Sequence, residues 1–115
     1  MTHLLDTSAL LAHYLAENGA ERVQALFEDV AVEAGASILS LYEFELRLHQ
    51  LGLDAVTRVT ELNRYRALLT EVVDVTEAVR GEAIRLRTSA TAHVAAMDVL
   101  IAASASLGKR NARSP

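Results

Sequence analysis

Short apolar runs with the character of β-strands alternate with amphipathic helical segments along this 115-residue chain. This alternation restricts the possible folds more than any other feature of the sequence. Strand-like runs lie at residues 3–5, 30–38 and 71–75, and in the second run every other residue from Val30 to Ile38 is apolar. Between these runs, apolar residues recur every three or four positions. Strands separated by helices favour a parallel sheet covered on both faces. The pattern therefore predicts an α/β fold in which a short parallel sheet is flanked by helices.

Capping residues and glycines mark the ends of the expected helices. Thr7 or Ser8 can cap a first helix that Gly19 ends. Ser40 is expected to begin a helix that ends at Gly52. Further helices are expected around Val23 to Phe27, from Asp54 to Leu69, from Thr76 to Leu86 and from Ala95 to Leu107.

Length and composition indicate a single domain. A chain of 115 residues with 51% hydrophobic content can bury roughly two thirds of its unfolded surface in one core. No apolar run approaches the roughly 18 uninterrupted residues of a membrane span. Asp6 also interrupts the first apolar run, which is untypical of a signal peptide. We therefore expect a cytoplasmic protein with no membrane partner. The absence of cysteine excludes disulfides, thiolate metal sites and a cysteine nucleophile.

The net charge of −4 argues against a protein that binds nucleic acid through bulk electrostatic attraction. The basic residues are nearly all arginines, and they cluster at residues 58–66 and 80–87. These clusters are consistent with solvated helix faces on which arginines pair with Glu61, Glu77 and Glu82.

Three acids interrupt apolar sequence: Asp6 after the first strand, Glu43 on an amphipathic helix and Asp98 near the start of an apolar helix. Burying an ionised carboxylate without a partner is costly, so such acids are hydrogen-bonded, protonated or bound to a cation. Asp6 is expected in the crevice at the carboxyl ends of the parallel strands. Asp98 would border the same crevice if its helix starts near Met97. We predict that the three carboxylates share one pocket.

Several carboxylates in one pocket favour a hard divalent cation, and a set of oxygen ligands suits Mg²⁺ or Mn²⁺. Each acid also has a structural explanation of its own. Asp6 and Asp98 are placed to cap helices or to lie in first turns, and Glu43 is four residues from Arg47, the spacing of a surface ion pair.

Three segments around these acids together resemble the acidic motifs of PIN-domain ribonucleases. The segments are His3 to Ala12 (HLLDTSALLA), Ser40 to Leu48 (SLYEFELRL) and Met97 to Ala105 (MDVLIAASA). They follow the family's order at about its spacing, and the likeness is greatest to the compact VapC-type toxins of toxin–antitoxin systems. The resemblance covers His3 to Gly108. It implies a PIN-like three-layer fold in a domain spanning residues 1–108, followed by a basic polar tail at residues 109–115.

The resemblance implies a metal-dependent endoribonuclease that uses Mg²⁺, with Mn²⁺ as a possible substitute, and that acts as the toxin of a type II toxin–antitoxin system. Asp6, Glu43 and Asp98 match the catalytic acids of the family, and Asp6 and Asp98 match its metal-binding acids. Ser8 matches a hydroxyl position beside the first acid, where it could orient that carboxylate; a helix cap is the alternative role. The implied partners are an RNA substrate, a cognate antitoxin and a second copy of the chain in a homodimer.

The sequence departs from the family's pattern after Gly108. Family members usually continue into another strand followed by a further acid, whereas residues 109–115 here are polar and basic. We therefore expect the last strand and a fourth acid to be missing, the metal to bind more weakly, and dimerisation or an antitoxin to cover the exposed sheet edge. One alternative is a catalytically impaired PIN remnant that acts as a protein-binding module. Another is a generic α/β domain with dispersed surface acids.

The histidines match no catalytic position of the family and share no spacing typical of metal ligands. They are interpreted as structural or surface residues: His3, His13, His49 and His93.

Overall fold

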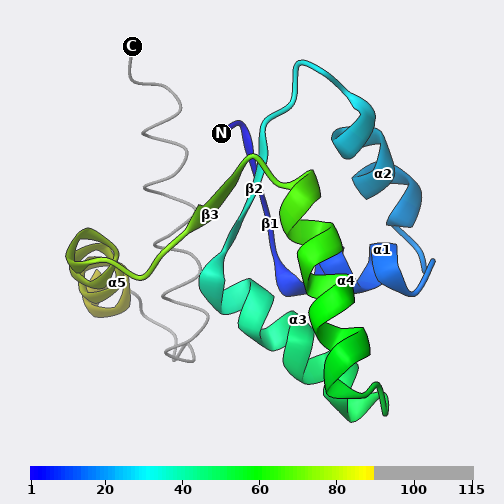
Figure 1. Ribbon diagram of the computed structural model, residues 1–115. Coiled ribbons are helices and arrows are strands. Elements are labelled where there is room, and N and C mark those ends of the chain that lie inside the picture. The colour runs from blue at the N-terminus through cyan, green and yellow to red at the C-terminus, as the bar shows by residue number, and fades with distance from the viewer. Residues whose placement is uncertain (90–115) are drawn as a thin grey trace.

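A computed structural model describes residues 1–89 of the chain. Strands and helices alternate as the sequence predicts, with parallel strands in one sheet, so the predicted α/β fold is confirmed (Figure 1). The elements in chain order are β1 (His3–Leu5), α1 (Thr7–Tyr14), α2 (Ala20–Glu28), β2 (Ala34–Ser37), α3 (Ile38–Gln50), α4 (Ala55–Leu68), β3 (Glu71–Val73) and α5 (Glu77–Ser89).

The sheet has the strand order β1-β2-β3, and both pairs of neighbouring strands are parallel. In the central strand β2, Gly35 lies opposite Leu4 of β1 and Glu71 of β3. All four residues of β2 are buried. Its sequence, Ala-Gly-Ala-Ser, has small side chains, which suit a strand covered on both faces.

Figure 1 shows helices on both sides of the sheet, with α5 beyond β3 and apart from the other four helices. Helix α1 packs against α2 and α3, and α3 packs against α4. The arrangement agrees with a PIN-like three-layer fold. In residues 1–89, no helix combines the length and the apolar character that a membrane span requires.

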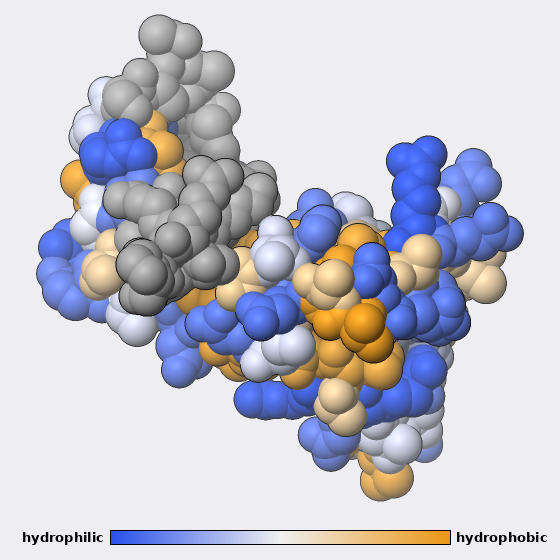
Figure 2. All heavy atoms as spheres, turned by 90° about the horizontal axis from the view of Figure 1, so that it is seen from above, coloured by the Kyte–Doolittle hydropathy of each residue, from blue (hydrophilic) through white to orange (hydrophobic). Residues whose placement is uncertain are grey.

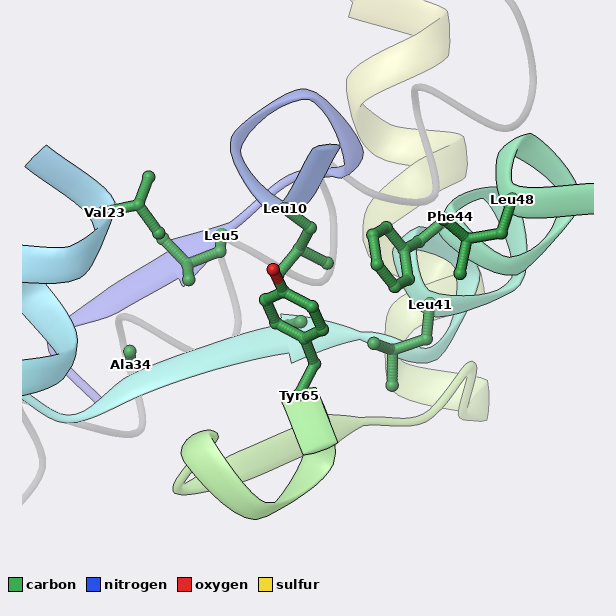
Figure 3. Close-up of a cluster of buried hydrophobic side chains, with 9 residues drawn as sticks. Leu5, Leu10, Val23, Ala34, Leu41, Phe44, Leu48 and Tyr65 are labelled. Carbon is green, nitrogen blue, oxygen red and sulfur yellow. The ribbon is translucent and has the colours of Figure 1, made fainter. Parts of the chain in front are cut away.

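Side chains from β1, β2 and helices α1 to α4 meet in one hydrophobic core. Tyr65 of α4 reaches between Leu10 of α1 and Phe44 of α3 in Figure 3, and all three side chains are completely buried. The rings of Phe44 and Tyr65 meet edge to face with their centroids 5.0 Å apart. Burial of such large side chains dominates the stability of a domain of this size.

The predicted strand at residues 30–38 is longer than the strand that forms. Strand β2 covers only Ala34–Ser37, and Val30 is fully exposed in the connection that precedes it. The predicted alternation of buried and exposed positions is wrong here, because a central parallel strand is buried on both faces. Helix α3 begins at Ile38 rather than at Ser40, since the Ser37 hydroxyl accepts a hydrogen bond from the Leu39 amide at 3.1 Å.

The glycines and caps follow the predictions in part. Gly52, with a φ of 93°, follows the end of α3, and its amide donates to the His49 carbonyl at 2.9 Å, as expected of a glycine that ends a helix. Gly19, with a φ of 98°, instead precedes the first residue of α2. The expected helix at residues 95–107 lies outside the described residues.

Arginine–glutamate pairs form on the helix faces as predicted. The guanidinium groups of Arg64, Arg80 and Arg85 contact the carboxylates three residues before them, which belong to Glu61, Glu77 and Glu82. These contacts hold the pKa values of the three arginines above their ordinary value. The two clusters therefore include arginines that are paired within their own helices.

Candidate functional site

Asp6 lies at the carboxyl end of β1, between the buried Leu5 and the first turn of α1. Its carboxylate caps α1, because Oδ1 accepts a hydrogen bond from the amide of Ala9 at 2.8 Å. The prediction that Thr7 or Ser8 caps this helix is therefore wrong. A carboxylate is also a favourable cap because the helix dipole is positive at this end. Asp6 is exposed to solvent.

Glu43 lies on α3, which follows β2 directly through the capping residue Ser37. The Glu43 side chain is half-buried, and its Oε2 accepts a hydrogen bond from the hydroxyl of Thr7 at 3.2 Å. Because Thr7 is the residue next to Asp6, this contact brings the two acids to the same edge of the sheet. The predicted alternative of a Glu43–Arg47 surface pair is not what forms, since Arg47 donates to Gln50 at 3.2 Å.

Thr7 joins the first turn of α1 to α3. Its side chain is buried, and its Oγ1 lies 3.2 Å from Glu43 Oε2 and 3.3 Å from the backbone carbonyl of Ser40. A threonine hydroxyl has one hydrogen to donate, so these two acceptors share a single donor. The Ser40 hydroxyl is fully buried and has no hydrogen-bond partner among residues 1–89. A polar cluster therefore lies beside the two acids within an otherwise apolar core.

The two carboxylates each have an oxygen available for a cation. Within residues 1–89, the protein's own hydrogen bonds use Oδ1 of Asp6 and Oε2 of Glu43, so Oδ2 and Oε1 remain. Oxygen ligands of this kind fit a hard ion such as Mg²⁺ or Mn²⁺. In the described part of the chain, no group of three or more acids, histidines or cysteines could hold a metal ion. A complete site needs a further ligand from elsewhere.

Asp98, the third predicted acid, lies outside the described residues. The prediction that all three acids share one pocket therefore stays a prediction. Ser8 is exposed in the first turn of α1, and its proposed role in orienting Asp6 also stays a prediction. Sequence reasoning missed Thr7 and Ser40. Their positions in the sequence could have indicated them, because Thr7 follows Asp6 directly and Ser40 lies one helical turn before Glu43.

His13 belongs to a second polar cluster, which links three helices. Its Nδ1 is 2.6 Å from the Tyr65 hydroxyl, and its Nε2 is 2.6 Å from Oε1 of Gln24. Gln24 in turn donates to Glu28 at 2.8 Å. Burial raises the pKa of the Tyr65 phenol, which favours the protonated form that can donate to His13. These contacts agree with the predicted structural role of His13.

Solved structures with a similar fold include two protein complexes bound to DNA fragments. The crystal structure of VapBC2 from Rickettsia felis bound to a DNA fragment from their promoter is similar with a TM-score of 0.71 and 18% identity, covering 91% of this chain and 80% of that chain. The structure of FitAB bound to an IR36 DNA fragment is similar with a TM-score of 0.68 and 24% identity, covering 93% of this chain and 80% of that chain.

None of the curated proteins compared with the chain matches it. The sequence model of the PIN domain family matches residues 3–112, which is nearly the whole chain. This match includes the first two acidic motifs, which the hydrogen bond from Thr7 to Glu43 joins. The chain therefore belongs to the PIN domain family.

Proposed function

We propose that this chain is a Mg²⁺-dependent endoribonuclease, the toxin component of a type II toxin–antitoxin system, and that Mn²⁺ can replace Mg²⁺. The hydrogen bond from Thr7 to Glu43 is the observation that carries the proposal, because it ties the acid after β2 to the acid after β1. In parallel α/β sheets this end of the strands is where ligands bind. Membership of the PIN domain family supports a nuclease with this arrangement.

Asp6, Glu43 and Asp98 are the proposed catalytic acids. Asp6 and Asp98 are the proposed metal ligands, and the free oxygen of Glu43 is proposed to contact the same ion. When bound, the ion supplies an activated water and stabilises the charge that develops on the scissile phosphate. The protein's part is to hold its carboxylates in place. The Ala9 amide fixes one oxygen of Asp6, and Thr7 fixes one oxygen of Glu43. Ser8, next to this pair on α1, is proposed to orient Asp6.

The proposed partners are an RNA substrate, a cognate antitoxin protein and a second copy of the chain. Exposed apolar side chains on α3 and α4 support a protein partner: Tyr42, Leu46, Val56 and Val59 are between 40% and 78% exposed. Figure 2 shows the molecule from above the view of Figure 1, where apolar residues also gather among hydrophilic ones. The similar structures of VapBC2 and FitAB are both bound to DNA fragments. The proposal includes a cytoplasmic location, where the RNA substrate is found.

A second candidate is a catalytically impaired PIN remnant that serves as a protein-binding module. The exposed apolar side chains of α3 and α4 favour it, because they suit a protein partner whether or not the chain cleaves RNA.

An RNA-cleavage assay titrated with Mg²⁺ and with Mn²⁺ tests the proposal. We expect metal-dependent cleavage by the native chain and a loss of at least 100-fold in the Asp6→Asn variant, as for loss of a catalytic group. Asp29→Asn is the matched control, because the Asp29 carboxylate is also exposed and also accepts a backbone hydrogen bond, from Ala31 at 2.9 Å. No cleavage by the native chain at any metal concentration would leave the binding module as the function, and equal metal-dependent cleavage by both proteins would contradict the role of Asp6.

A further inference from the structure

We infer that Thr7 is a positioning residue that holds the Glu43 carboxylate beside Asp6 in the orientation that a bound cation requires. The inference rests on the proposed function. It assigns the orienting role at Glu43 to the hydroxyl of Thr7, which lies in the core, whereas the role proposed for Ser8 concerns Asp6.

The geometry around Thr7 decides which acceptor receives its proton. The hydroxyl oxygen is nearly equidistant from Glu43 Oε2, at 3.2 Å, and the Ser40 carbonyl, at 3.3 Å. A hydrogen bond to an ionised carboxylate is stronger than one to a neutral carbonyl. The proton therefore goes to Glu43, which fixes Oε2 and leaves Oε1 for a cation.

Because Thr7 is buried, its hydroxyl restricts the Glu43 side chain more than a solvent-exposed hydroxyl could. Thr7 is 9% exposed, whereas Ser8 is exposed to solvent. Around the buried Thr7 hydroxyl, little water competes for the hydrogen bond, so the bond restricts the rotamers of Glu43 more strongly. The branched Thr7 side chain is also stiff about χ1, so the position of its hydroxyl is itself well defined.

Thr7 also makes the position of Glu43 depend on Asp6. Thr7 is the first residue of α1, and Asp6 fixes the start of that helix through its bond to the Ala9 amide. The first turn of α1 therefore fixes Asp6 directly and Glu43 through Thr7. Mg²⁺ demands near-ideal octahedral geometry, so a carboxylate that is free to change rotamer binds it poorly. Groups that orient ligands in this way typically change metal affinity by about 10-fold to 100-fold.

The first test measures Mn²⁺ binding to the metal-free protein by calorimetry. Thr7→Val keeps the shape of the side chain and removes the hydroxyl, and we expect its affinity for Mn²⁺ to fall by about 10-fold. Thr7→Ser restores the hydroxyl and should bind within about threefold of the native chain, on the same reasoning. Thr60→Val is the control, because the Thr60 hydroxyl donates only to the carbonyl of Val56, on the exposed face of α4.

A second measurement distinguishes positioning from general destabilisation. In RNA cleavage, Thr7→Val should need more Mn²⁺ for half-maximal rate but approach the native rate when Mn²⁺ is saturating. In the metal-free state, the effects of Thr7→Val and Glu43→Ala on unfolding should be non-additive, because the two residues share one contact. A maximal rate that stays low at saturating Mn²⁺, or additive effects on unfolding, would contradict a positioning role.

The possible failures are separable. If the native chain and Thr7→Val bind Mn²⁺ with equal affinity, Thr7 does not position Glu43, while the proposed nuclease function stands. If the native chain neither binds Mn²⁺ nor cleaves RNA, the proposed function fails, and the inference on Thr7 fails with it.

Discussion

At the scale of single residues, Asp6 combines a structural role with a proposed chemical one. Its Oδ1 caps α1 through the Ala9 amide, which leaves Oδ2 of the exposed carboxylate available. The explanation of Asp6 as a helix cap and its assignment as a metal ligand are therefore compatible, since they use different oxygens. Substitutions that keep or remove the cap can separate the two roles.

We expect Asp6→Asn to leave the free energy of unfolding of the metal-free protein nearly unchanged, because asparagine caps helices as well as aspartate does. Asp6→Ala should lower this free energy by about 1 kcal/mol, the usual cost of losing a cap. Urea denaturation without metal measures both. If Asp6→Asn costs several times as much as Asp6→Ala, the carboxylate has a structural role beyond the cap.

Tyr65→Phe should lower the free energy of unfolding by about 1–3 kcal/mol, because His13 loses its hydrogen-bond partner at the edge of the core. Tyr42→Phe, at a tyrosine that is 58% exposed, is the control and should change little. Urea denaturation at neutral pH compares the two. Equal costs at both positions would show that the contact between Tyr65 and His13 adds nothing to stability.

The raised pKa of Tyr65 also predicts how stability depends on alkaline pH. The unfolded chain releases the phenolic proton at lower pH than the folded chain does, so stability is retained below the unfolded pKa and falls as pH rises above it. Tyr65→Phe should show a shallower alkaline decrease than the native chain in thermal melts. Parallel decreases in the two proteins would contradict this effect of burial.

The sequence indicated Asp6 and Glu43 as candidate site residues because they are charges that interrupt apolar patterns. It did not predict the role of Thr7. The contact between Thr7 and Glu43 joins residues 36 positions apart, and it depends on how α1 crosses α3. Local patterns carry no information about such a crossing.

At the scale of helices and strands, the period of hydrophobic residues predicted the type and order of the elements better than their ends. Strand β2 shows the reason. All four of its residues are buried, so it has no solvent-exposed face. The alternation of apolar residues, which indicates a half-buried strand, therefore extended the predicted strand to Val30, which is fully exposed. The boundary is set instead by the buried neighbours on both faces, which belong to distant parts of the chain.

Gly35 in β2 should not tolerate a side chain. A Cβ at this position would overlap the Met1 side chain and lie 3.0 Å from the Glu71 carbonyl of β3. We expect Gly35→Ala to lower the free energy of unfolding by about 1–3 kcal/mol, the usual cost of overpacking.

Gly81→Ala is the matched control, because a Cβ on this residue of α5 would meet nothing within 4 Å. Alanine is the better helix former, so this substitution should raise the free energy of unfolding by up to about 1 kcal/mol. Urea denaturation measures both variants. If Gly35→Ala is as stable as the native chain, the packing of Met1 and β3 against β2 is looser than described.

At the scale of the whole molecule, the alternation of strands and helices was enough to predict a parallel sheet with helices on both faces, and the acidic motifs were enough to predict the PIN domain family. The fold explains how residues far apart in sequence reach the same edge of the sheet. Parallel strands place Asp6 and the start of α3 at the same edge of the sheet. There Thr7, the residue after Asp6, donates a hydrogen bond to Glu43 of α3.

The most direct test of a shared cation site at Asp6 and Glu43 is the thermal unfolding of the native chain, Asp6→Asn and Glu43→Gln with and without Mn²⁺. Both substitutions remove a charge and keep an oxygen that can accept the existing hydrogen bond. We expect Mn²⁺ to stabilise the native chain, by about 2.7 kcal/mol at 100 times its Kd, and each substitution to remove most of this gain. An equal gain in all three proteins, or no gain in the native chain, would contradict the shared site.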